Sequence, residues 1–203
     1  MNFYNSLIAS LPDEPFLLGK RLKKHFSVLV PFIGSNKESL LFELRAKGIR
    51  QSGEICFPGG MVENGETPEE CAIRETVEEL GIKRSQVEIT AKAGCIVSHR
   101  DAIIHVFIGV LHIESLAETS PNKKEVAEIF AVPAPFFTET KPEIYQVESY
   151  TETGSFPVKE LGLPKRYYGS WANGKRNIYV YKYGDKVIWG LTAAILYELI
   201  SLL

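Results

Sequence analysis

Residues 57–82 read FPGGMVENGETPEECAIRETVEELGI, and this stretch decides how the rest of the chain is interpreted. A Gly-Gly turn stands ahead of a run that holds seven glutamates and a single arginine. Runs of acidic residues are commonly the solvated faces of helices. The spacing of the glutamates is what argues for something more specific.

The segment carries the signals that begin and end a helix. Thr67 is a suitable N-cap, Pro68 fits the first helical position, and Glu70 completes a capping box. Gly81 stands where a helix commonly stops. The sequence therefore predicts one helix over residues 68–80.

Three carboxylates share one face of this predicted helix. At roughly 100° per residue, Glu75, Glu78 and Glu79 lie within an arc of about 100°. They repel one another unless a cation lies among them, and hard divalent cations such as Mg²⁺ prefer carboxylate oxygens. Arg74 is placed to orient one carboxylate, and the preceding glycines let the backbone approach a phosphate or metal. A solvated acidic face is the alternative interpretation.

The same residues resemble a known family signature. Gly60, five residues, Glu66, seven residues and then RETVEELGI (74–82) resemble the signature of the Nudix hydrolases. Thr76 departs from it, because a bulky aliphatic residue is typical there. The resemblance implies an α+β fold, an α/β/α sandwich around a mixed β-sheet with this loop-helix-loop as its catalytic element. It also implies Mg²⁺-dependent hydrolysis (with Mn²⁺ as a substitute) of a diphosphate joined to another group.

The resemblance further implies roles for individual residues. Metal ligands would be Glu75, Glu78, Glu79 and the carbonyl of Gly60 or Gly59, and Arg74 would orient Glu75. Glu66 and Gly81 would be supporting residues. The general base stays open among Glu75, Glu125 and Glu128.

A second resemblance concerns substrate. LLFELRAKGIRQSGEICFPGG (40–60) is similar to the pattern that precedes the signature in coenzyme A pyrophosphatases, and weaker similarity extends over roughly residues 26–201. Phe42 replaces a Leu, Glu43 stands where Thr is common, and Arg50 is one residue closer to Gly53 than the pattern has it. This resemblance implies cleavage of coenzyme A or acyl-CoA to 3′,5′-ADP and (acyl-)4′-phosphopantetheine. Arg45, Arg50 and Gly59 are then the candidate substrate-binding residues.

Two alternatives remain beside this hypothesis. An ADP-ribose or nucleoside-diphosphate-sugar pyrophosphatase would need no site for a 3′-phosphate. A non-catalytic ligand-binding module on the same scaffold would have little reason to keep three repelling glutamates. In both enzyme hypotheses the partner is a small nucleoside diphosphate derivative.

The amino-acid composition limits the classes of protein to which the chain can belong. The chain has 203 residues, 45% hydrophobic and 24% charged, with a net charge of −2, so we expect a globular protein with no general attraction to nucleic acid or membranes. Its three cysteines form no CxxC pair, which argues against a disulfide framework or a zinc site. The N-terminus lacks a basic, apolar leader. The expected location is the cytoplasm.

Periodicity and turn residues predict the remaining elements. We expect an N-terminal helix within a basic segment, 1–25, that packs on a single Nudix domain, 26–203. The apolar terminal helix would suit a homodimer interface as well as a core. The predicted elements are a helix at 2–11, strands at 27–34, 39–46, 53–60, 87–98 and 102–113, a helical turn leading to a strand over 125–133, a loop-rich region to about 175, a hairpin at 177–190 and a helix at 191–203.

Overall fold

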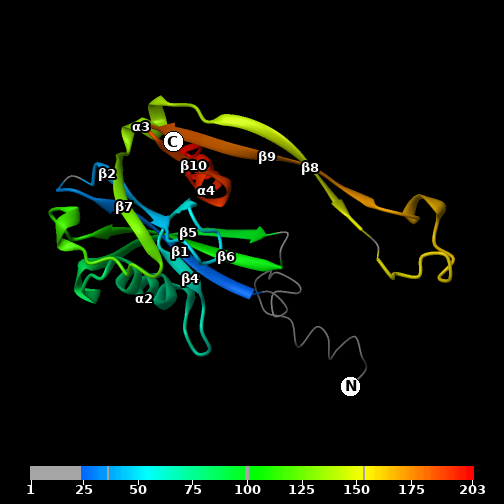
Figure 1. Cartoon of the computed structure of the whole chain (residues 1–203), viewed down its shortest axis with the longest axis horizontal. Helices are drawn as coiled ribbons and strands as arrows, with labels where there is room; N and C mark the ends of the chain where they lie inside the picture. The colour runs from blue at the N-terminus through cyan, green and yellow to red at the C-terminus, as the bar shows by residue number, and fades with distance from the viewer. Residues whose placement is uncertain (1–23, 36, 99–100, 153) are drawn as a thin grey trace, which may run out of the picture.

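The computed structural model describes residues 24–35, 37–98, 101–152 and 154–203 (Figure 1). The helix predicted at 2–11, and most of the 1–25 segment, lie outside these residues. The described elements are β1 (Lys24–Ile33), β2 (Ser39–Arg45), β3 (Ile55–Cys56), β4 (Gly59–Met61), α2 (Pro68–Leu80), β5 (Val87–Ser98), β6 (Ala102–Leu111), β7 (Val126–Pro133), α3 (Pro135–Glu139), β8 (Glu143–Thr151), β9 (Trp171–Tyr183), β10 (Lys186–Trp189) and α4 (Gly190–Ile200).

A mixed sheet forms the centre of the molecule. Within the described residues seven strands belong to it, in the order β3-β2-β1-β6-β5, with β4 also paired to β1 and β7 to β2. β1 and β6 run parallel, whereas the other pairs are antiparallel. β6 is buried along most of its length, as expected for a strand covered on both faces.

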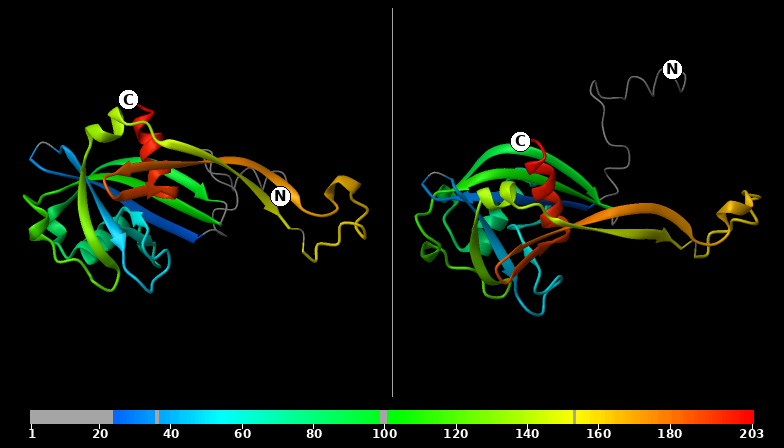
Figure 2. Two further views of the ribbon diagram at one scale, coloured as in Figure 1. Left: turned by 45° about the horizontal axis from the view of Figure 1, so that its top comes forward. Right: turned by 90° about the horizontal axis from the view of Figure 1, so that it is seen from above.

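Helices cover both faces of this sheet (Figures 1 and 2). α2 packs on one face, where Ala72, Ile73 and Leu80 join a buried cluster with Leu41 and Phe107. On the other face α3 and α4 pack with β9 and β10 over a second, aromatic-rich cluster. The predicted α/β/α sandwich is therefore confirmed, and α4 contributes to the core through its buried residues Thr192, Ala193, Ile195 and Leu196.

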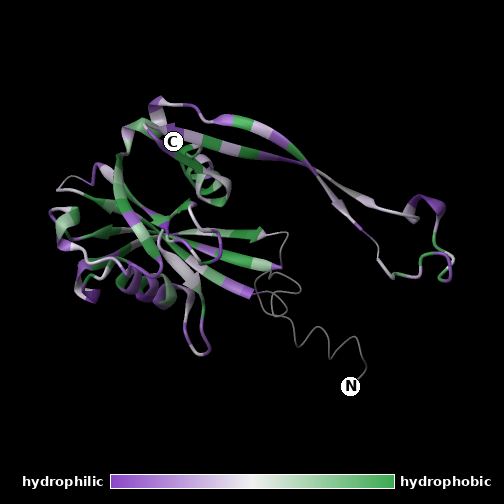
Figure 3. Cartoon of the chain, viewed as in Figure 1, coloured by the Kyte–Doolittle hydropathy of each residue, from purple (hydrophilic) through white to green (hydrophobic). Residues whose placement is uncertain are grey.

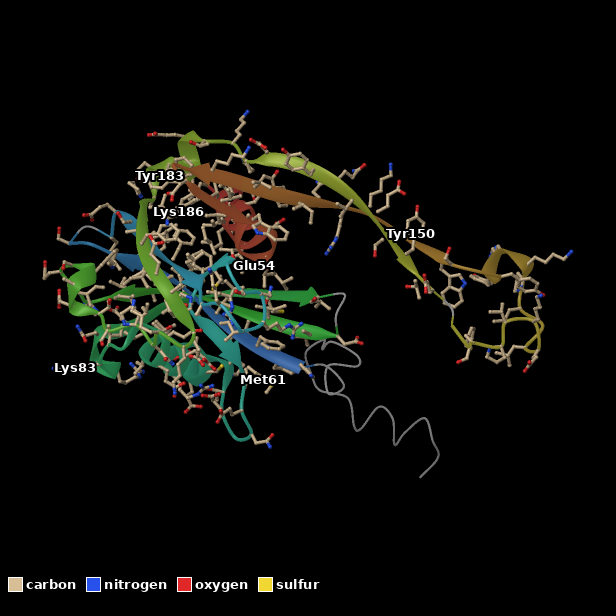
Figure 4. The ribbon with its side chains drawn as sticks, in the orientation of Figure 1. Glu54, Met61, Lys83, Tyr150, Tyr183 and Lys186 are labelled. Atoms are coloured by element: carbon tan, nitrogen blue, oxygen red, sulfur yellow. The ribbon has the colours of Figure 1, made fainter. Side chains whose placement is uncertain are left out.

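A long two-stranded arm leaves this body. β8 and β9 pair from Glu143↔Val180 to Thr151↔Trp171, and Figure 1 shows them projecting well beyond the sandwich. Bands of apolar and polar residues alternate along the inner part of this ribbon, and its outer part is mostly polar or of intermediate hydropathy (Figure 3). Tyr150, exposed, lies far along it (Figure 4).

The sequence predicted most of the body and missed the arm. The helix at 68–80 has the predicted bounds, and the strands at 39–46, 87–98 and 102–113 are close to those observed. The single strand expected at 53–60 is instead two short strands, β3 and β4, and the helical turn expected near 125 is a turn outside any helix. The prediction of a loop-rich region up to about residue 175 missed β8 and the start of β9, and it is confirmed for the described residues between these two strands. Among the described residues, none of the helices has the length and apolar character needed to cross a bilayer.

Candidate active site

The predicted capping signals position α2. Thr67 Oγ1 accepts a hydrogen bond from the Glu70 amide at 3.2 Å, and Glu70 Oε2 accepts one from the Thr67 amide at 2.8 Å. Gly81 ends the helix in the left-handed region at φ 62°, and its amide donates to the Val77 carbonyl. These caps fix where the helix begins and ends. The glycine loop, 57–60, contacts the helix through the hydrogen bond from the Gly59 amide to Glu79.

Arg74 gathers three carboxylates around one guanidinium. Its Nε and Nη2 donate to the two oxygens of Glu66 at 2.8 and 3.2 Å, a bidentate pair. Its Nη1 lies 2.9 Å from Glu75 Oε1 and 3.1 Å from Glu78 Oε2. The hydrogen bond from Arg74 holds the pKa of Glu66 below its usual range. Arg74 therefore contacts Glu75 and Glu78 as well as Glu66.

Glu79 differs from its neighbours because it is buried, with 4% of its surface exposed. The Gly59 amide donates to its Oε2 at 2.8 Å. Burial raises the pKa of Glu79 to about 7, and the nearby charge of Glu75 adds to this effect while the hydrogen bond from Gly59 opposes it. Glu79 thus lies between the helix and the glycine loop, and it does not belong to a solvated helix face.

The glycine loop comes unusually close to these carboxylates. A Cβ atom on Gly60 would lie 2.2 Å from Glu75 Oε1, and one on Gly59 would lie 2.2 Å from the Ser27 carbonyl oxygen of β1. Neither position accepts a side chain without movement of its neighbours. Burial raises the pKa of Glu75, which Arg74 opposes.

A carboxylate that sequence reasoning did not assign also belongs to this site. Glu43, on β2, has 0% exposure, and neither of its oxygens has a hydrogen-bond partner among the described residues. Burial raises its pKa, and the charge of Glu79 raises it further. The sequence signals that could have found it are an acidic residue inside the apolar run 40–44 and its departure from the Thr of the related pattern.

The two candidate substrate arginines occupy different places. Arg45 Nη1 lies 4.0 Å from Glu79 Oε1, and Arg45 Nε donates to the Arg50 carbonyl at 3.1 Å. Arg50 itself lies on the exposed turn between β2 and β3. Arg45 therefore lies near the carboxylate of Glu79. Arg50 lies on the protein surface, on a turn that we call the rim of the site.

Glu125 and Glu128, the two later candidates for the general base, also occupy different places. Glu125 precedes β7, and its charge acts on Glu43, Glu75 and Glu79. Glu128 pairs with Lys186 of β10, at 2.8 Å from Nζ to Oε2. Its neighbour Ile129 packs in the α2-side cluster, so Glu128 points to the opposite face of the sheet. The structure brings Glu125 to the site and leaves Glu128 away from it.

This donor set fits a hard divalent cation. Within the described part of the chain, no group of three or more His, Cys, Asp or Glu side chains is arranged so that it could hold a metal ion. Mg²⁺ commonly keeps several waters and takes one or two carboxylates together with substrate phosphates, so a complete protein cage is not required. The orphaned oxygens of Glu43 and the crowding of buried carboxylates are the features that a cation would relieve.

Comparison with protein families gives one assignment over most of the chain. The NUDIX domain family model matches residues 23–147. This segment holds the glycine loop, α2 and the strand β2 that carries Glu43 and Arg45.

Individual proteins are similar to this chain over different lengths. A mouse protein described as peroxisomal coenzyme A diphosphatase NUDT7 is 36% identical over 132 residues, which are 64% of this chain and 54% of the mouse protein. The aligned region thus spans little more than half of that relative. A Photorhabdus laumondii protein described as uncharacterized Nudix hydrolase NudL is 28% identical over 200 residues, 98% of this chain and 94% of that protein. A solved Ap4A hydrolase complex from C. elegans is 18% identical, with a TM-score of 0.46, covering 54% of this chain and 80% of that one.

Proposed function

Because the chain belongs to the Nudix hydrolase family, we propose that it is a divalent-metal-dependent diphosphatase acting on coenzyme A or acyl-CoA. The products are 3′,5′-ADP and 4′-phosphopantetheine or its acyl form. The observation that carries the proposal is the 36% identity to the mouse coenzyme A diphosphatase over 132 residues. The segment 40–60, with its resemblance to the coenzyme A pyrophosphatase pattern, supports the same substrate.

The chain's own residues have distinct tasks in this proposal. Glu75, Glu78 and Glu79, with the carbonyl of Gly60, hold Mg²⁺ or Mn²⁺. Arg74 positions two of these carboxylates, and Glu66 holds Arg74 in place. A cation bound here supplies neutralisation of the diphosphate charge and a water of lowered pKa.

Two carboxylates remain candidates for the general base. Glu75 lies within the group held by Arg74, and Glu125 is exposed at the start of β7 where its charge acts on the same group. Glu128 is a weaker candidate, because Lys186 engages its carboxylate on the other face of the sheet.

The positions of the two arginines suggest how substrates are distinguished. Arg45 lies beside Glu79, so its charge suits the diphosphate that all candidate substrates share. Arg50 lies at the exposed rim, where a more distant phosphate such as the 3′-phosphate of coenzyme A can be reached. A charge-assisted contact of about 1.5–3 kcal/mol corresponds to a preference of roughly 10- to 150-fold.

A substrate panel tests this proposal. We expect coenzyme A or a short acyl-CoA to have a higher kcat/KM than 3′-dephospho-CoA, ADP-ribose or diadenosine polyphosphates, with products identified by mass spectrometry. Chelation should abolish turnover, and Mg²⁺ or Mn²⁺ should restore it. Arg50→Ala should reduce only the preference over dephospho-CoA, whereas Arg45→Ala should slow every substrate.

The alternatives predict other outcomes of the same panel. If ADP-ribose were the best substrate, the coenzyme A assignment would be wrong and the family assignment would stand. If no diphosphate turned over with any divalent metal, a ligand-binding module would become the better hypothesis.

A further inference from the structure

Glu43 is an anomaly in the interior of the protein. Its side chain is fully buried on β2, and both carboxylate oxygens are orphaned within the described residues. Buried polar groups are almost always hydrogen-bonded, and an unpaired buried carboxylate is costly. The Glu79 carboxylate is its one side-chain hydrogen-bond neighbour among the described residues, and two carboxylates can be joined only by a shared proton or by a cation.

The strand directs Glu43 towards the carboxylates of α2. Side chains alternate along β2, so Leu41, Glu43 and Arg45 share one face. Leu41 packs in the α2-side cluster, and Arg45 Nη1 lies 4.0 Å from Glu79 Oε1. The charges acting on Glu43 come from Glu79, Arg45 and Glu125. Glu43 thus faces the carboxylates that the proposed function assigns to the metal.

Arg45 is engaged elsewhere and does not satisfy Glu43. Its Nε donates to the Arg50 carbonyl at 3.1 Å, and its Nη1 lies 4.0 Å from both Cys56 Sγ and Glu79 Oε1. On the neighbouring strands Glu43 stands opposite Cys56 and Ile129, neither of which carries a charge that could compensate it. What remains is a space shared by carboxylates, for which a hard cation is the matching occupant.

We propose that Glu43 is a further ligand of the divalent cation, supplied by the sheet from outside the signature helix. The inference rests on the proposed function for the existence of the metal site. It adds a carboxylate to a site otherwise built from α2 and the glycine loop. The chain would then bind its cation more tightly than a relative with Thr at this position, since affinity rises with the number of charged ligands.

The test measures metal binding directly, without substrate. The full chain is stripped with a chelator and titrated with Mn²⁺, and free Mn²⁺ is followed by electron paramagnetic resonance. Thermal unfolding with and without Mg²⁺ gives a second readout. Glu43→Gln removes the charge at nearly constant shape, and Glu43→Thr introduces the residue common in the related pattern. Glu88→Gln, an exposed carboxylate on β5, is the matched control.

We expect Glu43→Gln and Glu43→Thr to raise the Mn²⁺ dissociation constant by at least about tenfold. They should also reduce the increase in Tm caused by Mg²⁺, while the metal-free Tm is unchanged or higher because an unpaired buried carboxylate has been removed. Glu88→Gln should bind as the wild type does. A loss of affinity in proteins that remain folded without metal cannot come from unfolding.

Several results would overturn the inference. One is a wild-type dissociation constant and stoichiometry in both Glu43 variants. Another is a higher metal-free Tm with unchanged Mn²⁺ affinity, which would make Glu43 a buried acid that shares a proton with Glu79. Cleavage of coenzyme A together with either result leaves the proposed function standing. Mn²⁺ binding that depends on Glu43, without cleavage of coenzyme A, would contradict the proposed substrate alone.

Discussion

At the scale of single residues, the site depends on which carboxylates are neutralised by the protein itself. Arg74 contacts Glu66, Glu75 and Glu78, so these three carboxylates share one positive charge in the metal-free protein. Among the described residues, the groups that offset the charge of Glu79 are the Gly59 amide and, at 4.0 Å, Arg45 Nη1. The demand for an external cation is therefore greatest around Glu79.

Glu79→Gln should lower kcat by at least about 10³-fold with the fold intact. The amide oxygen of Gln can still accept from Gly59, whereas the anionic ligand is lost. Steady-state kinetics at saturating Mg²⁺ measures the effect, and Glu69→Gln, an exposed change on the same helix, is the control. Turnover near the wild-type rate in folded Glu79→Gln protein would contradict the assignment of Glu79 to the metal.

The raised pKa of Glu79 predicts how the metal-free protein responds to pH. A carboxyl group with a folded pKa of about 7 and an ordinary pKa of 4.5 binds its proton more tightly in the folded state. It therefore stabilises the fold fully below pH 4.5, and this contribution is lost as pH rises to 7 and above. His105, whose pKa burial lowers, acts in the opposite sense below pH 6.5.

The difference in Tm between the wild type and Glu79→Gln isolates the contribution of Glu79 to stability. In a chelating buffer, the Tm of the wild type minus that of Glu79→Gln should fall between pH 5 and pH 8. Added Mg²⁺ should reverse part of the fall, because it compensates the ionised carboxylates. If the difference were flat, or rose with pH, Glu79 would titrate near its ordinary pKa.

The sequence predicted the site residues of α2 but did not lead to Glu43 on β2. The glutamates of α2 were predictable because helical periodicity and the family spacing place them together. Glu43 was signalled by its place in an apolar run, but its approach to α2 was not predictable, since that depends on how β2 is placed beside the helix in the folded sheet. Burial of Glu79 was missed for the same reason: an acidic face looks solvated until the neighbouring loop is known.

At the scale of elements, α2 and the glycine loop work as one unit. Figure 1 shows β4 directly beside the helix, and Gly59 and Gly60 are the residues of β4 that face it or β1. The helix bounds could be predicted from sequence because Thr67, Pro68 and Gly81 act locally. The close approach of the loop could not, because it is a tertiary contact.

A pair of glycine variants should separate positioning from stability. Gly60→Ala places a methyl group 2.2 Å from Glu75 Oε1, so the flexible carboxylate must move. We expect kcat to fall by at least about tenfold with a small change in Tm. Gly59→Ala instead meets the Ser27 carbonyl oxygen at 2.2 Å and the Val28 Cα, both backbone atoms, so we expect mainly a loss of stability.

Kinetics and thermal unfolding of both glycine variants check this expectation. The structural account would be wrong if Gly60→Ala lost stability as strongly as Gly59→Ala while keeping its kcat. That result would mean that the Glu75 carboxylate is free to leave Gly60 without consequence for catalysis.

At the scale of the whole molecule, the chain divides into a body with two cores and an arm without one. The body was largely predictable, since buried strands such as β6 show long apolar runs. β8 is exposed along almost its entire length, so no buried face imposes a pattern on its sequence. Ile144 and Tyr145 are consecutive and both exposed, which is unusual for a strand and explains why this region resembled a loop.

The base of the arm, by contrast, belongs to the body. Tyr181 is buried and packs edge-to-face on Phe137, and Tyr179 stacks on Tyr197 of α4 with ring centroids 4.0 Å apart. Lys186, at the adjoining strand β10, pairs with Glu128 of β7 (Figure 4). Removal of the outer arm should therefore spare these contacts.

Shortening the arm is the test at this scale. Replacing residues 147–176 by Asn-Gly joins the register partners Gln146 and Asn177 through a tight hairpin turn. We expect the Tm to change by no more than about 2–4 °C, equivalent to about 1 kcal/mol for a chain of this size. The increase in Tm caused by Mg²⁺ should be unchanged, because the carboxylates lie on α2 and β2. An isolated two-stranded ribbon is marginally stable, so its loss removes little from the body.

A shortened protein that failed to fold, or that lost its response to Mg²⁺, would show that the arm supports the site through contacts beyond its own two strands.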